Sequence, residues 1–325
     1  MINGKVFVSR PLHKDALKLL KDTFSIVDVW EEGTPSQDEF KERARNCMAL
    51  VTVGSDKVDS GLLDMAPEVK VVANIAVGYD NFDLPAARKK KVILTNTPGV
   101  LTKATATLAF ALLIMTSRRI LEAANDAIAG RWEPISPQGG WLGHDLHGCT
   151  LGIVGLGRIG SEMARQAEAF DMKVIYYSRR RYPQVETKYN LNYVKDLQCL
   201  LRISDFVSLH VPLTEETRYL IGTKELSMMK PTAILINTAR GAVVNQDALI
   251  QALQTGTIAG AGLDVTTPEP LPVDSPLFSM RNVVIAPHIG SATHETRREM
   301  AILAVRNVIA VCMGQPALTP VDLIL

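Results

Sequence analysis

Short apolar runs alternate with segments whose apolar residues recur at helical spacing along almost the whole chain. Strands that alternate with helices are typical of β-α-β units, in which a crossover helix makes successive strands parallel. In the first part of the chain the pattern predicts strands over residues 5–9, 26–30, 49–53, 69–74 and 92–95, with helices that include 13–22 and 37–45. These elements are sufficient for an α/β unit of their own.

The same alternation returns after a break at residues 96–99 (NTPG), where proline and glycine favour a turn. An apolar helix is predicted over 102–117, a glycine-rich loop over 130–148, and strands over 151–154, 173–177, 206–209, 233–237, 259–263 and 283–285. No strand follows the last helix, about 291–313, so we expect this helix to return to the first unit. We therefore expect one domain from residues 1–97 and 290–325 and another from residues 98–289.

Composition narrows the class of protein. A chain of 325 residues suits two domains, and 35 Lys and Arg against 34 Asp and Glu give no electrostatic reason to expect a nucleic-acid or membrane partner. The longest apolar stretch, near residues 108–115, is too short to span a bilayer, and the amino terminus lacks the apolar block of a signal peptide. The cysteines are widely spaced, so we expect free thiols and a cytoplasmic protein: Cys47, Cys149, Cys199 and Cys312.

A glycine-rich turn joins the first strand of the second unit to the next helix. Residues 151–160 read LGIVGLGRIG, in which Gly155, Gly157 and Gly160 have the G-x-G-x-x-G spacing. The glycines allow a tight turn, close approach of a pyrophosphate and close packing of the helix, whose positive end faces the phosphates. We therefore expect an α/β fold with two Rossmann-like doubly wound parallel-sheet domains, the first discontinuous and closed by the C-terminal helix.

The next strand indicates which dinucleotide binds. Residues 172–182 read MKVIYYSRRRY, and Ser178 takes the place where NAD sites usually carry an acidic residue for the ribose. Arg179, Arg180 and Arg181 follow, and a guanidinium can hold a phosphate with two hydrogen bonds. The pattern favours the 2′-phosphate of NADP, with NAD as the other cofactor; the alternative reading is a solvated basic loop.

Polar residues follow three later strands, in the segments NTARG, DVTTPEP and PHIGSA. Ligands of open α/β sheets bind beyond the carboxyl ends of strands, so Arg240, Asp264, Glu269 and His288 are expected to converge beside the dinucleotide. Three of these residues have a plain alternative: a surface ion pair for Arg240, a structural role for His288, and simple exposure for Glu269.

Arginine, histidine and a carboxylate together suit the reduction of a 2-oxo acid. Arg240 would hold the substrate carboxylate, and His288 would deliver a proton to the carbonyl oxygen while Glu269 orients its ring. His144 and His147 lie in the glycine-rich loop with only Asp145 nearby, so we expect no metal site.

The motifs GLGRIG, NTARG, GLDVTTPEPLP and PHIGSAT, with VGYDNFD at residues 77–83, resemble the D-isomer-specific 2-hydroxyacid dehydrogenase family, and most closely its glyoxylate/hydroxypyruvate reductase branch. The resemblance implies that the discontinuous domain is a flavodoxin-like substrate domain and the other binds NAD(P). It implies that Arg240, Glu269 and His288 are catalytic, and that the Val77 and Gly78 amides help hold the substrate. It also places the following residues at the cofactor: Thr105, Gly155, Gly157, Arg158, Ile159, Gly160, Ser178, Arg179, Arg180, Thr238, Ala239 and Asp264.

The resulting interpretation is an NADPH-preferring reductase of glyoxylate and hydroxypyruvate, which gives glycolate and D-glycerate. One alternative is a longer substrate such as 2-ketogluconate; another is a cofactor-sensing, corepressor-like binding protein. The resemblance also implies a homodimer. Trp141 matches a tryptophan that reaches across the dimer interface toward the partner's site in this branch, and its alternative role is simple packing at an interface or in the core.

Overall fold

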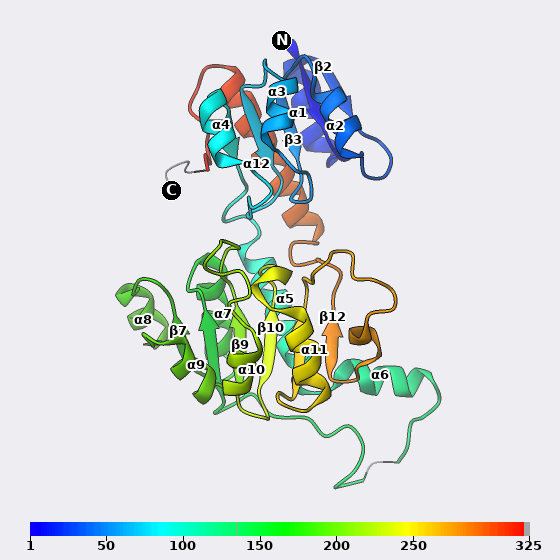
Figure 1. Cartoon of the computed structure of the whole chain (residues 1–325), viewed down its shortest axis with the longest axis vertical. Coiled ribbons are helices and arrows are strands. Elements are labelled where there is room, and N and C mark those ends of the chain that lie inside the picture. Colours follow the sequence, from blue (N-terminus) through cyan, green and yellow to red (C-terminus); the bar gives the residue numbers. More distant parts are fainter. Residues whose placement is uncertain (135, 322–325) are drawn as a thin grey trace. The chain divides into compact units, whose positions relative to one another are not determined.

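The computed structural model describes residues 1–134 and 136–321. The chain divides into two compact units (Figure 1): unit 1 is Met1–Leu101 with Ser291–Leu325, and unit 2 is Thr102–Gly290. The sequence placed these divisions at residues 97 and 290. The chain thus leaves unit 1 shortly after its fifth strand and returns with the last helix.

Unit 1 contains a 5-stranded sheet in the order β2-β1-β3-β4-β5, and all of its strand pairs are parallel. This is the flavodoxin-like order of a doubly wound fold. The strands are β1 (Ile2–Val8), β2 (Phe24–Val29), β3 (Cys47–Thr52), β4 (Val71–Asn74) and β5 (Ile93–Thr95). The helices are α1 (Lys14–Thr23), α2 (Gln37–Ala44), α3 (Ser60–Met65), α4 (Leu84–Lys90) and α12 (His294–Cys312).

The carboxyl-terminal part of the chain is built into unit 1. Helix α12 begins at a Thr293 cap and buries Met300, Val305 and Val308. After the helix, the Val321 amide donates to the Leu94 carbonyl of β5 at 2.8 Å. The expectation that the last helix returns to the first unit is confirmed.

Unit 2 contains a 7-stranded sheet in the order β12-β11-β10-β9-β6-β7-β8, again with parallel pairs. Strand β6 has β7 on one side and β9 on the other, which is the switch point of a Rossmann sheet. The strands are β6 (Thr150–Val154), β7 (Lys173–Tyr177), β8 (Asn192–Tyr193), β9 (Phe206–Leu209), β10 (Ile234–Asn237), β11 (Gly260–Leu263) and β12 (Val283–Ile285). The α-helices are α5 (Thr102–Ser117), α6 (Ile120–Ile128), α7 (Arg158–Glu168), α8 (Pro183–Tyr189), α9 (Leu197–Ile203), α10 (Thr223–Met228) and α11 (Gln246–Gln254).

Two hydrophobic layers cover the faces of this sheet. One joins α5 and α7 to the strands through residues such as Leu113, Ile153 and Met163, and the other includes Leu235 and Leu249. The bounds of α5 agree with the prediction, because this helix is apolar on most of its surface and packs in the core. In the described residues no single helix is long and apolar enough to cross a membrane; α5 and α6 pass that test only as a pair bent by 65°.

The sequence missed one short strand and placed the start of another too late. Strand β8 has only two residues and pairs with Ile175 and Tyr176, so no apolar run marks it. Strand β1 begins at Ile2 rather than at residue 5, because Ile2 already pairs with Phe24.

Candidate active site

The glycine turn lies at the switch point of unit 2. Gly155 has a φ of +99°, and its amide donates to the Tyr177 carbonyl at 2.9 Å. A Cβ at Gly155 would come within 2.9 Å of the His210 carbonyl group, and a Cβ at Gly160 would overlap the Gly155 carbonyl oxygen. The turn therefore requires glycine at the first position for its backbone, and at the third so that α7 can pack close.

The second glycine has a different environment, which allows a cofactor test. Gly157 caps α7 without a side-chain hydrogen bond, and a Cβ at Gly157 would meet no atom within 4 Å. Open space thus adjoins uncapped helical amides, as pyrophosphate binding requires. The buried Thr238 hydroxyl also has no hydrogen-bond partner in the described part of the chain. These features fit a dinucleotide. Arg158 and Ile159 are the first two residues of α7, and their contact with a cofactor stays a prediction.

The three arginines after β7 do not have the same role. The guanidinium of Arg181 pairs with the Glu186 carboxylate at 2.7 Å, and Glu186 also accepts the Tyr176 hydroxyl at 2.6 Å. The hydrogen bond from Arg181 and that from Tyr176 hold the pKa of Glu186 below its usual value, against the effect of desolvation. Arg179 and Arg180 are exposed, and neither forms an ion pair within the described residues. Only these two remain available to a 2′-phosphate next to Ser178.

Arg240 follows β10 in a turn that is fixed by two hydrogen bonds from one side chain. The Asn237 side chain accepts from the Ala239 amide at 3.0 Å and donates to the Arg240 carbonyl at 2.9 Å. The next residue must be glycine, because a Cβ at Gly241 would overlap the Thr266 carbonyl of the neighbouring strand-end loop. Asn237 is a positioning residue that the sequence did not single out. Asparagine side chains often accept a hydrogen bond from the backbone amide two residues later in a turn, so the NTARG segment does carry a signal for this role.

Glu269 and His288 meet beyond β11 and β12. The His288 Nδ1 lies 3.0 Å from the Glu269 Oε2, and the Thr266 amide donates to the Glu269 Oε1 at 3.2 Å. Burial acts to raise the pKa of Glu269, but the His288 hydrogen bond, its charge and that of Arg240 outweigh burial and lower the pKa. The carboxylate is therefore ionised at neutral pH, and it can accept a hydrogen bond from the ring of His288.

The backbone of His288 is held in an unusual conformation. Its φ is +54°, in the left-handed region, which costs about 1–2 kcal/mol for a residue with a Cβ. The His288 amide donates to the Asp264 carbonyl at 2.8 Å, and the Asp264 carboxylate accepts the Ile289 and Gly290 amides at 2.7 and 2.8 Å. Asp264 is thus the anchor of the histidine loop, and backbone strain of this kind is concentrated at functional sites.

Asp264 is almost fully buried, and burial raises its pKa although the two amide bonds act to lower it. Thr105 of α5 adjoins the same place, since a Cβ at Gly290 would lie 3.0 Å from the Asp264 Oδ2 and 3.3 Å from the Thr105 Cγ2. The sequence assigned both residues to the cofactor. The structure gives Asp264 this further role, and contact of either residue with a cofactor stays a prediction.

Arg240, Asp264, Glu269 and His288 all belong to unit 2, at the ends of three neighbouring strands. Val77 and Gly78 belong to unit 1, in the loop after β4. The Val77 carbonyl accepts from the Asn96 side chain at 2.7 Å, and the Gly78 carbonyl accepts from Asn74 at 3.0 Å. These bonds fix the loop, and the Val77 and Gly78 amides have no hydrogen bond among the described residues.

The glycine-rich loop contains three residues with other candidate roles: Trp141, His144 and His147. The Trp141 ring nitrogen donates to the Asp126 Oδ2 at 2.9 Å, so this side chain is tied to α6 of its own chain. No group of three or more His, Cys, Asp or Glu residues that could hold a metal, His144 and His147 included, is found in residues 1–134 and 136–321.

Comparisons with known proteins show which chains this one resembles. The model of the D-isomer specific 2-hydroxyacid dehydrogenase NAD binding domain matches residues 110–290. The glyoxylate reductase of Thermococcus litoralis is 51% identical over 317 residues, which cover 96% of this chain and 94% of the relative.

Solved structures are similar over almost the full chain. A Thermus thermophilus protein matches with a TM-score of 0.92 and 44% identity, covering 98% of this chain and 100% of that chain. An NADPH-dependent glyoxylate/hydroxypyruvate reductase of Sinorhizobium meliloti, in complex with NADP and malonate, matches with a TM-score of 0.86 and 34% identity, covering 98% and 97%.

Proposed function

Because this chain belongs to the D-isomer specific 2-hydroxyacid dehydrogenase family, we propose that it reduces glyoxylate to glycolate and hydroxypyruvate to D-glycerate, with NADPH preferred over NADH. The observation that carries the proposal is the hydrogen-bonded pair of His288 and Glu269, next to the loop of Arg240 and in the same unit as the glycine turn. The similarity to glyoxylate reductases supports the substrate class.

The proposed mechanism assigns one task to each side chain. Arg240 holds the substrate carboxylate with its planar fork, and the amides of Val77 and Gly78 add hydrogen bonds to it. A bound nicotinamide supplies the hydride that adds to the carbonyl carbon. His288, protonated and oriented by Glu269, transfers its Nε2 proton to the carbonyl oxygen, which becomes the hydroxyl of the product. The imidazole is left neutral and is reprotonated before the next turnover.

Initial rates with glyoxylate, hydroxypyruvate, pyruvate and 2-ketogluconate, each with NADPH and with NADH, test this proposal. We expect kcat/KM to be highest for the two substrates of the reductase branch, glyoxylate and hydroxypyruvate, with NADPH. A higher kcat/KM for 2-ketogluconate would contradict the substrate assignment. Absence of turnover with all four acids would contradict the enzymatic function and favour a cofactor-sensing protein.

The cofactor preference has a separate test in the double variant Arg179→Ala/Arg180→Ala. Loss of two guanidinium contacts to a phosphate is expected to raise KM for NADPH about tenfold or more, with little change for NADH. Arg202→Ala is the matched control, since it removes an exposed arginine from the last turn of α9 in the same unit. Equal weakening of both cofactors by the double variant would rule out the 2′-phosphate role.

We propose that the chain works as a homodimer in the cytoplasm. Its support is the exposure of three large apolar side chains on α6 and the following loop: Ile128, Trp132 and Leu142 are 86%, 76% and 61% exposed. Light scattering should give twice the chain mass of 35.5 kDa, and a monomer at micromolar concentration would contradict the dimer.

Free cysteines support a reducing compartment. Recovery of the chain with exported or membrane proteins would contradict the compartment.

A further inference from the structure

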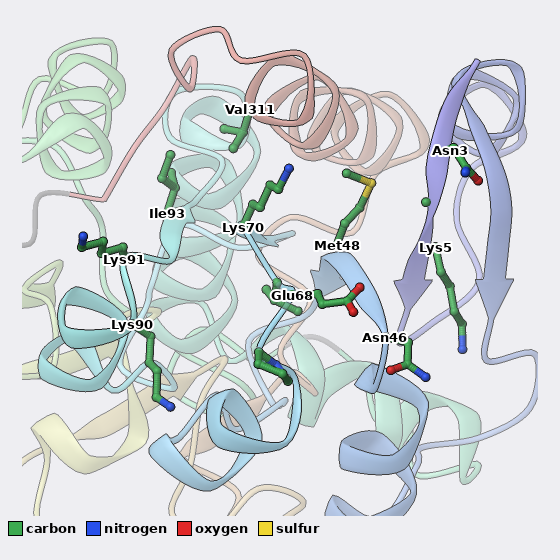
Figure 2. A pocket seen from close by; sticks show the side chains of 13 residues that line it. Asn3, Lys5, Asn46, Met48, Glu68, Lys70, Lys90, Lys91, Ile93 and Val311 are labelled. Atoms are coloured by element: carbon green, nitrogen blue, oxygen red, sulfur yellow. The ribbon is translucent and has the colours of Figure 1, made fainter.

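A cavity of about 620 Å³ lies in unit 1, at the amino ends of four parallel strands (Figure 2). Its residues come from the starts of β1, β3, β4 and β5 or just before them, and from the end of α12. The Val77 and Gly78 loop follows the carboxyl end of β4, so the cavity lies at the opposite edge of the same sheet. The lining residues are Asn3, Gly4, Lys5, Asn46, Met48, Pro67, Glu68, Val69, Lys70, Lys90, Lys91, Ile93 and Val311.

Lys70 occupies the centre of this cavity. Its amide donates to the Met48 carbonyl and its carbonyl accepts from the Ile93 amide, both at 2.9 Å. These bonds fix the Lys70 backbone between two neighbouring strands. Its side chain extends between Ile93 and Met48 toward Val311 (Figure 2). An ammonium group is thus combined with three apolar side chains in one hollow.

The charges of the lining are only partly compensated. Lys5 pairs with Asp28 at 2.9 Å and Lys90 with Asp64 at 2.5 Å. Lys70 and Lys91 form no ion pair within the described residues, and Glu68 is the one acidic side chain of the lining. Burial raises the pKa of the Cys312 thiol to about 11, and the nearby charge of Lys70 lowers this pKa only in part. The thiol is therefore neutral and does not compensate the lysine.

We propose that this cavity binds a small organic anion that carries a carboxylate or phosphate group and an apolar part. Lys70 attracts the anionic group, Lys91 adds a positive charge on the far side of Ile93 (Figure 2), and the Asn3 and Asn46 amides provide hydrogen-bond donors at the rim. Met48, Ile93 and Val311 contact the apolar part. The volume lies in the usual range for small-molecule sites. None of these residues belongs to the proposed catalytic machinery, so the inference goes beyond the proposed function.

The methyl group of Met48 provides a direct probe. The chain has 11 methionines, so protein labelled with ¹³C at the methionine methyl groups gives a countable spectrum, and Met48→Leu identifies the Met48 signal. The full chain is titrated with phenyl phosphate, benzoate, inorganic phosphate and benzyl alcohol. We expect the Met48 signal to shift saturably with phenyl phosphate or benzoate at lower concentration than with the other two probes. The tighter of the two aromatic anions identifies the preferred anionic group.

The double variant Lys70→Ala/Lys91→Ala should weaken this binding about five- to tenfold, as expected for the loss of an exposed ion pair and of a second positive charge nearby. Lys18→Ala/Lys21→Ala on α1 is the matched control and should bind as the unaltered chain does. Glyoxylate reduction should be unchanged in both double variants. The titration measures binding and not turnover, so it can be interpreted even if the proposed function fails its own test. The proposal is overturned if Met48 does not shift, if the lysine variant binds normally, or if inorganic phosphate binds as well as phenyl phosphate, which would show an adventitious ion only.

Discussion

Replacement of His288 by alanine is expected to lower kcat for glyoxylate reduction by about 10²- to 10⁴-fold, the usual contribution of a positioned general acid. The His288 Nδ1 is occupied by Glu269 at 3.0 Å, so Nε2 is the nitrogen left to give a proton to substrate. Its side chain is about half exposed, which leaves the ring open to a ligand. Steady-state kinetics with saturating NADPH measure the loss.

Two further measurements separate a proton donor from a structural histidine. The variant should bind NADPH with unchanged affinity, and added imidazole should restore part of its activity. Glu269→Gln is the companion variant: it keeps a hydrogen-bonding side chain beside His288 but removes the carboxylate charge. Its loss of kcat should be smaller than that of His288→Ala. If His288→Ala kept near-normal turnover, the assignment of the acid would be wrong.

The position of this pair was predictable because it depends on topology. In a parallel sheet the carboxyl ends of all strands share one edge, so polar residues after successive strands converge there. Strands β10, β11 and β12 are neighbours, as their order along the chain suggested. The anchoring role of Asp264 was not predictable in this way. Its carboxylate accepts two amides from a loop 25 and 26 residues later, and this contact depends on the fold of both loops.

The basic segment after β7 shows another limit of sequence reading. Three consecutive arginines look alike in the chain, yet Arg181 is paired with Glu186 of α8. The difference arises because a turn brings the start of α8 back to Tyr176, where the Tyr182 amide donates to the Tyr176 hydroxyl. A run of three arginines in the sequence does not predict this turn. Val77 and Gly78 present a related case. Their proposed contribution is made by backbone amides, so only the resemblance to known motifs singled them out, while Asn74 and Asn96 position the loop.

Replacement of Arg240 by alanine is expected to lower kcat/KM for glyoxylate by roughly 10²- to 10⁴-fold. A planar guanidinium can make two charge-assisted hydrogen bonds to the substrate carboxylate, each worth about 1.5–3 kcal/mol. The turn at Asn237 fixes the backbone from which this side chain extends. Arg240→Lys keeps the charge but loses the fork, so it should recover only part of the activity.

The decisive comparison uses a substrate that lacks the anionic group. Methyl glyoxylate presents the same reacting carbonyl without a free carboxylate, so an arginine that acts as the clamp contributes little to its reduction. The alanine variant should then approach the unaltered chain in kcat/KM for the ester while it remains far below it for the acid. An arginine that only supports the fold, or that only lowers the Glu269 pKa, would depress both substrates alike. Equal losses for acid and ester would therefore remove Arg240 from the substrate clamp and leave His288 and Glu269 without their partner in the proposed mechanism.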